Sequence, residues 1–162
     1  MHTNAAAQLE KIVLNAGIGR MSAQPHFGDK LLPAVIEEFA LIAGQKPAPR
    51  PARQSIAGFK MREGTIVGLK ATLRGHRMAA FFEKLVAIVL PRLRDFRGID
   101  PDSIDRSGTL TIGLKDHTVF SEVSPDVARS SFGMEITLVP RRVKSRDQAI
   151  ELYRKLGVPL KK

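Results

Sequence analysis

The chain has 162 residues, of which 43% are hydrophobic, and it contains no cysteine. This length fits a single domain, residues 1–162, with a real hydrophobic core, and it excludes disorder throughout. Without cysteine there is no disulfide framework, no thiolate zinc site and no cysteine nucleophile. No apolar run approaches the roughly 18 residues of a membrane-spanning helix, and no signal-peptide pattern opens the chain, so we expect an intracellular protein without a membrane partner.

The formal net charge of +10 is unevenly distributed along the chain. Residues 46–77 carry eight Lys or Arg against one acid, and residues 141–162 carry eight against two, whereas residues 98–135 carry three against seven. A generally basic surface without a binding partner would also give a high net charge. Polarisation by segment favours a polyanionic partner, with nucleic acid as the first candidate. RNA binding does not explain the acidic middle segment, which we expect to face a protein neighbour or solvent.

The first half of the chain predicts a strand, a helix, an extended segment and a second strand. Residues 10–18 alternate with period two, and residues 28–43 show helical spacing that Gly44 ends. Three prolines restrict GQKPAPRPARQS, residues 44–55, to an edge strand or an extended connection. Residues 65–74 alternate again, and the face opposite the apolar one carries Lys70, Thr72 and Arg74. Such a face is a plausible platform for RNA.

The second half predicts a helix from Met78 to about Pro91, strands at 110–114 and 134–138, and a C-terminal helix. Ser145 and Gln148 fit a capping box in which Gln148 returns to the N–H of Ser145, and Gly157 ends this helix. The element order indicates an α+β fold with two layers. We expect a mainly antiparallel sheet, helices packed on one face, and a protruding basic loop at residues 55–64.

The short motifs that resemble catalytic or ligand sites do not match their templates. Gly17-Ile-Gly19 lacks the third glycine of a dinucleotide fingerprint, and the glycine spacing in 64–70 is one residue short of a phosphate loop. The aspartates of IDPDSID lack the glycine and glutamate of a calcium loop, so we interpret them as turn and capping residues. The four histidines are far apart, and we place most of them at the surface. We expect neither a metal nor a cofactor, while a Ser–His–Asp triad stays open because its members meet only in space.

The segment SIAGFKMREG, residues 55–64, sets Phe59 among glycines and the cations Lys60 and Arg62. Aromatic rings stack on exposed bases and cations neutralise phosphates, so this composition suits an RNA-facing loop. The alternative is that Phe59 folds back into the core and the glycines only allow a turn.

Five segments in order closely resemble the bacterial ribosomal protein L-five family, over about Lys11 to Pro159: KIVLNAGIG, LIAGQKP, SIAGFKMREG, LKATLRGHRM and LPRLRDFRGI. The resemblance implies an α+β fold, no enzymatic activity, and a structural protein that binds 5S rRNA in the central protuberance of the large subunit. By motif match, the 5S rRNA patch is Asn15, Gln45 and Thr72. Lys46, Lys70 and Arg74 are candidate phosphate contacts.

The resemblance further implies that the loop 55–64 touches peptidyl-site tRNA. Its tip would consist of Ala57, Gly58, Phe59, Lys60, Met61 and Arg62. Large-subunit rRNA and neighbouring ribosomal proteins, including one of the small-subunit head, are the other implied partners. The expected location is the ribosome, in the cytoplasm or in an organelle.

The chain departs from the family at its start, because MHTNAAAQLE is too short for the helix that usually precedes the first strand. We treat residues 1–9 as a short extension. A reduced genome, an organelle or another start site would each explain it. The alternative function, from another class, is a stand-alone RNA-binding assembly factor or an RNA-acting enzyme on a basic α+β scaffold.

Overall fold

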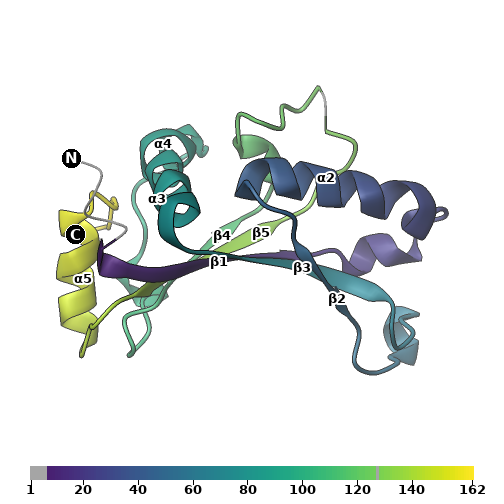
Figure 1. Cartoon of the computed structure of the whole chain (residues 1–162), viewed down its shortest axis with the longest axis horizontal. Helices are drawn as coiled ribbons and strands as arrows, with labels where there is room; N and C mark the ends of the chain where they lie inside the picture. The colour runs from purple at the N-terminus through teal and green to yellow at the C-terminus, as the bar shows by residue number, and fades with distance from the viewer. Residues whose placement is uncertain (1–6, 127) are drawn as a thin grey trace. The chain divides into compact units, whose positions relative to one another are not determined.

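The computed structural model describes residues 7–126 and 128–162, which form two compact units (Figure 1). Unit 1 contains the chain up to Val13, Thr72–Gly113 and Glu135–Lys162, and unit 2 contains Leu14–Ala71 and Leu114–Met134. Most of the expected extension, residues 1–9, lies outside the described part. Ala7 and Gln8 have helical backbone, and the first strand begins at Leu9. Among the described helices, none has the length and apolar character needed to cross a membrane.

The described strands form a five-stranded sheet in the order β2-β3-β1-β5-β4. Their bounds are β1 Leu9–Gly17, β2 Ala48–Pro51, β3 Ile66–Leu73, β4 Leu110–Leu114 and β5 Met134–Pro140. The strand β2 lies at the edge and pairs antiparallel with β3, with a register irregularity between Arg50 and Pro51. The expected edge strand in the proline-rich segment is therefore confirmed. An edge is where prolines are tolerated, because one side of such a strand needs no N–H donors.

Alternation along the strands gives each unit one buried sheet face. In unit 2, Leu14 and Ala16 of β1 and Leu69 and Ala71 of β3 are buried. In unit 1, buried strand residues that follow the alternation include Ile12, Leu73, Leu110, Ile112, Ile136 and Leu138, while Leu9, at the start of β1, is buried three residues before Ile12. The residues between them are half-buried or exposed. One face of each unit is thus packed into the core, as the period-two patterns predicted.

The helix α2, Leu32–Ala43, supplies the helical layer of unit 2 and lies along one side of its strands in Figure 1. It buries Val35, Phe39 and Ile42 at helical spacing. A π-helical turn, Phe27–Leu31, precedes it, and Gly44 ends it in the left-handed region with φ of 73°. Glycine suits this position because it has no Cβ to strain a left-handed cap.

Unit 1 contains α3, Gly75–Lys84, a π-helical turn, Leu85–Val89, the short α4, Leu90–Arg92, and α5, Arg146–Lys155. Short 3₁₀ turns complete the described elements at Gly19–Ala23, Ala57–Phe59, Pro101–Ser103 and His117–Val119. Together with the antiparallel sheet, these helices confirm the α+β class.

The cap of α5 differs from the prediction in one contact. Ser145 Oγ accepts the N–H of Gln148 at 3.3 Å, as expected. Gln148 Oε1, however, accepts the N–H of Lys144 at 3.0 Å, so the predicted return to the N–H of Ser145 is wrong by one residue. The free N–H groups of the first turn are still partly satisfied.

Candidate nucleic-acid interface

The half-buried face of β1 and β3 carries the polar side chains that the sequence singled out. In unit 2, Asn15 lies between buried Leu14 and Ala16, and Lys70 lies between buried Leu69 and Ala71. Both residues are half-buried on neighbouring strands of the sheet. An amide and an ammonium group held on a strand in this way have fixed backbones and partly solvated heads. They are suited to a partner that brings both acceptors and negative charge.

Thr72 and Arg74 follow Lys70 along the same alternation and belong to unit 1. Thr72 is half-buried, and Arg74 is exposed at the residue before α3. Arg74 Nη1 lies 3.9 Å from Glu10 Oε1, and the two side chains are 57% and 50% exposed. An ion pair this open contributes little stability, so the guanidinium can exchange Glu10 for a phosphate at small cost.

Gln45 and Lys46 directly follow Gly44, the residue that ends α2. Gly44 N–H donates to the carbonyl of Ala40 at 2.9 Å, which closes the helix. The chain then turns toward β2, with Gln45 half-buried and Lys46 exposed. Four of the six candidate residues for 5S rRNA, Asn15, Gln45, Lys46 and Lys70, therefore belong to unit 2.

Arg50 shares this face but was not among the candidate site residues. It pairs with Gly68 across the β2–β3 ladder, and Ala48 pairs with Lys70. Paired residues of an antiparallel ladder point to the same side, so Arg50 and Lys70 lie on one face. Arg50 Cβ lies only 3.6 Å from where a Cβ on Gly68 would be, which fits this arrangement. The sequence APRP shows that Arg50 could alternate with its neighbours in a strand. Only the pairing of β2 with β3 shows on which face of the sheet Arg50 lies.

The loop 55–64 folds as a tight turn. The backbones of Ile56 and Met61 exchange two hydrogen bonds of 2.9 and 3.2 Å, and Ser55 Oγ accepts the N–H of Glu63 at 2.9 Å. Lys60 adopts the left-handed region with φ of 52°. The side chains of Ala57, Lys60 and Arg62 are exposed and Met61 is half-buried, whereas the side chain of Phe59 lies outside the described part. The side chains of Lys60 and Arg62 are therefore exposed to solvent, and hydrogen bonds within the loop stabilise its backbone.

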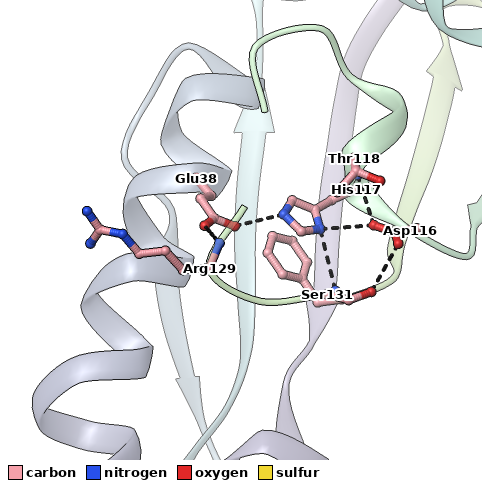
Figure 2. A network of polar contacts seen from close by, with 7 residues as sticks. Glu38, Asp116, His117, Thr118, Arg129 and Ser131 are labelled. Carbon is pink, nitrogen blue, oxygen red and sulfur yellow. Dashed lines mark hydrogen bonds and ion pairs between the residues drawn. The ribbon is translucent and has the colours of Figure 1, made fainter. Parts of the chain in front are cut away.

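A buried polar network in unit 2 is the feature that the sequence missed (Figure 2). His117 is fully buried, and its Nε2–H donates to Glu38 Oε2 at 2.7 Å. Glu38 Oε1 accepts the N–H of Arg129 at 2.7 Å, and Phe132 N–H points at His117 Nδ1 at 3.4 Å. The imidazole also stacks on the Phe132 ring at 3.8 Å between centroids. Of the three described histidines, His26 and His76 are exposed, as expected for most of the four, and His117 is the exception; His2 lies outside the described residues.

This network ties α2 to the 115–132 segment and leaves no group for chemistry. Asp116 Oδ1 lies 3.3 Å from His117 Nδ1, Oδ1 accepts the N–H of Thr118, and Oδ2 accepts Ser131 Oγ–H. Partial burial raises the pKa of Asp116, but these hydrogen bonds outweigh it and leave the pKa below its usual value. A base that is fully buried and bonded to a carboxylate cannot reach a substrate, so the network is structural.

Two of the three aspartates of IDPDSID shape turns, as predicted, whereas Asp102 Oδ1 accepts Arg146 Nη2–H at 2.8 Å. Asp100 Oδ1 accepts the N–H of Asp102, and Asp105 Oδ1 accepts the N–H groups of Ser107 and Thr109, each at 2.9 Å. Within the described ranges, no group of three His, Asp or Glu side chains could hold a metal ion.

Two family models match the chain. The model described as "Ribosomal protein L5" matches residues 3–62, and the model for the C-terminus of the same ribosomal protein family matches residues 66–160. Together they cover most of the sequence, and the gap between them, residues 63–65, falls at the end of the loop 55–64 just before β3.

Curated relatives match over almost the whole chain. The large ribosomal subunit protein uL5 of Halothermothrix orenii is 42% identical over 155 residues, which are 96% of this chain and 84% of that protein. The large ribosomal subunit protein uL5 of Rubrobacter xylanophilus is 44% identical over 153 residues, 94% of this chain and 82% of that protein. These matches confirm the resemblance that the five sequence segments carried, and the chain belongs to the ribosomal protein L5 family.

Proposed function

We propose that this chain is a structural constituent of the large ribosomal subunit, and that it binds 5S rRNA in the central protuberance through the half-buried face of β1 and β3. Its family is structural and non-enzymatic, and two relatives carry the name large ribosomal subunit protein. In unit 2 the proposed contacts are Asn15 and Gln45, with Lys46 and Lys70 for phosphates, and in unit 1 they are Thr72, with Arg74 for a phosphate. Arg50 extends this set of contacts toward the sheet edge.

The observation that carries this proposal is the polar alternation on a sheet whose other face is packed. Asn15, Lys70 and Thr72 are each flanked by buried apolar residues, so their orientation away from the core is fixed by the strand. Short amide and hydroxyl groups match the 2′-hydroxyls and base edges of the RNA minor groove, and the cations beside them match phosphates. An RNA held this way needs no large apolar contact.

The test is a titration of full-length protein with 5S rRNA. Asn15→Ala, Gln45→Ala and Thr72→Ala should each weaken binding by about 1–3 kcal/mol, because each leaves an RNA polar group without a partner in the interface. Gln24→Ala is the matched control, since Gln24 is exposed in the same unit as Asn15 and Gln45 and lies outside the proposed face. Full affinity in all three variants would refute the assigned face.

We further propose that the loop 55–64 contacts peptidyl-site tRNA. The exposed cations Lys60 and Arg62 on a hydrogen-bonded turn support this, because a small contact can release tRNA after each cycle. Lys60→Gln with Arg62→Gln should leave 5S rRNA affinity within about twofold, since neither residue belongs to the sheet face, and should reduce tRNA occupancy on reconstituted ribosomes. Arg141→Gln with Arg142→Gln removes the same charge elsewhere and serves as the control. An equal loss of 5S rRNA affinity in the loop variant would show that the loop is misassigned.

The remaining proposed partners are large-subunit rRNA and neighbouring ribosomal proteins, including one of the small-subunit head. The bacterial type of the relatives supports a place on cytoplasmic ribosomes. In this setting residues 1–162 act as a single RNA-binding domain with a short extension at 1–9.

A further inference from the structure

The four methionines that the structure describes differ in burial. Met78, Met134 and Met21 are buried, with 1%, 3% and 8% of their surface exposed. Met61 is half-buried and lies in the loop 55–64. A thioether reacts with oxidants at its sulfur, so its susceptibility depends on how readily a dissolved molecule reaches that side chain. Among the described methionines, Met61 is therefore the one that a dissolved oxidant reaches most easily.

A hollow of about 670 Å³ in unit 2 opens onto Met61. Its lining also includes Arg20 and Met21 in the turn after β1, and Phe132 just before β5. A water molecule takes up about 30 Å³ in the liquid, so the hollow is large enough for a peroxide molecule to enter. Met21 lines the same hollow but is buried, which makes it an internal comparison for Met61.

The side chain of Met61 links the loop 55–64 to the end of β1. A Cβ placed on Gly19 would lie 3.3 Å from Met61 Cε and 3.7 Å from Val67 Cβ. The methyl end of Met61 thus lies close to Gly19, which leaves room for it because glycine has no Cβ. The backbone of Met61 also exchanges with Ile56 the two hydrogen bonds of 2.9 and 3.2 Å within the loop. A chemical change at Met61 therefore acts where the loop is attached.

We propose that Met61 is a modification site: peroxides oxidise it to methionine sulfoxide in the folded protein, ahead of the other described methionines, and this oxidation loosens the loop 55–64. The inference goes beyond the proposed function and does not depend on it. A lone pair of the Met61 sulfur attacks one peroxide oxygen, and the O–O bond breaks as the S–O bond forms. Sulfur loses two electrons to the peroxide. The second oxygen leaves as hydroxide and takes the proton of the new S–OH group, which releases one water.

The sulfoxide is less compatible with this site than the thioether, because it is polar where the thioether is apolar. A sulfoxide oxygen kept beside Gly19 and Val67 would lie next to an apolar side chain, and a polar group without a hydrogen-bond donor costs free energy there. Turning the side chain toward water or toward the exposed Arg20 satisfies the oxygen but gives up the contact with Gly19. In both arrangements the loop is held less firmly.

The first measurement maps oxidation in the full-length protein treated with hydrogen peroxide. Cleavage after glutamate places each of the five methionines in a separate peptide, 1–10, 11–37, 39–63, 64–83 and 123–135, so mass spectrometry follows each one. In the folded protein, Met61 should be oxidised at least about fivefold faster than Met21, Met78 and Met134. In urea these four should react at similar rates. Equal rates for Met61 and Met21 in the folded protein, or a lead of Met61 that persists in urea, would overturn the site.

The second measurement follows hydrogen exchange of the Ile56 and Met61 amides by NMR. Oxidation of Met61 should speed their exchange at least about fivefold, and methionine sulfoxide reductase should restore the slow exchange. Met61→Leu fills a similar volume without a sulfur, so peroxide should leave exchange in this variant unchanged. Met21→Leu is the matched control. It retains Met61 and should respond to peroxide as the unsubstituted protein does.

Two results of this measurement would contradict the proposal. One is loop exchange that stays the same after Met61 is oxidised. The other is a Met61→Leu protein whose loop loosens in peroxide as much as that of the unsubstituted protein. If Met61→Leu itself disturbs the fold, oxidation and exchange in the unsubstituted protein still decide the matter. Neither measurement uses RNA, so failure here leaves the proposed function untouched, and failure of the 5S rRNA titration leaves this inference untouched.

Discussion

Two polar regions of unit 2 differ in what their side chains bond to. In the Glu38–His117 network, both carboxylate oxygens of Glu38 and both ring nitrogens of His117 have partners within the protein. On the half-buried face of β1 and β3, Asn15 and Lys70 keep part of their surface in solvent. Polar groups that are fully buried must be satisfied internally, while partly solvated ones can exchange water for a ligand. Burial therefore separates structural polar residues from candidate RNA contacts better than residue type does.

The largest expected effect comes from breaking the buried side of this comparison. Glu38→Ala should lower the free energy of unfolding by about 3 kcal/mol, because it strands the buried His117 and the Arg129 N–H without an acceptor. Urea unfolding measures it. Glu37→Ala, one residue earlier on α2 and exposed, is the matched control and should change stability by less than about 0.5 kcal/mol. Similar losses for the two variants would show that the network contributes no more than an exposed carboxylate.

A second buried polar group in unit 1 sharpens the same point. Tyr153 is fully buried, and its hydroxyl donates toward the carbonyls of Gly108 at 2.7 Å and Leu138 at 3.1 Å. Burial raises the pKa of this phenol far above its ordinary value, so it stays a neutral donor. Tyr153→Phe should destabilise the protein by about 1–2 kcal/mol, since the ring still fills its space but two carbonyls lose their donor. Calorimetry measures it, and an unchanged melting temperature would contradict it.

The open face should behave in the opposite way. Asn15→Ala should change the free energy of unfolding by less than about 0.5 kcal/mol while weakening 5S rRNA binding as proposed, because its amide is partly solvated in the free protein. Chemical unfolding and RNA titration on one protein sample separate the two effects. A loss of stability as large as that of Glu38→Ala would mean that Asn15 also serves the fold.

The smallest effect is expected at the exposed turn after Ile104. The hydrogen bond from Ser107 Oγ, and after it the backbone N–H groups of Thr109 and Ser107, lower the pKa of Asp105 in the folded state. A lowered pKa stabilises the fold above the unfolded value near 3.8, and this contribution disappears as pH falls through the folded value. Asp105→Asn should therefore cost at most about 0.5 kcal/mol at pH 7, given solvent screening, and nothing at about pH 2. A cost that stays constant between these pH values would contradict the assignment.

Local chemistry made much of the fold predictable. Gly44 and Gly157 end helices at positive φ, Ser145 caps α5, and alternation gave β1, β3, β4 and β5 their buried sides. These features depend on residues within one turn or one strand, so the sequence contains them in full. The same alternation placed Asn15, Lys70 and Thr72 on the half-buried face, while their role in binding 5S rRNA stays a prediction.

Contacts between distant residues could not be predicted in the same way. Glu38 and His117 are 79 residues apart, and nothing near either residue in the chain marks them as partners. The face of Arg50 follows only from the register of β2 with β3, and the segments that contain Arg97 and Lys161 are paired only through the Ile99–Leu160 bridge.

The sequence by itself determined the elements, their buried sides, the charge of the chain and the family. The tertiary structure decided which polar groups are buried and hydrogen-bonded inside the protein and which cations lie close together at its surface. The physical reason is that periodicity and capping act over a few residues, whereas burial and charge clustering depend on which segments the folded chain brings together.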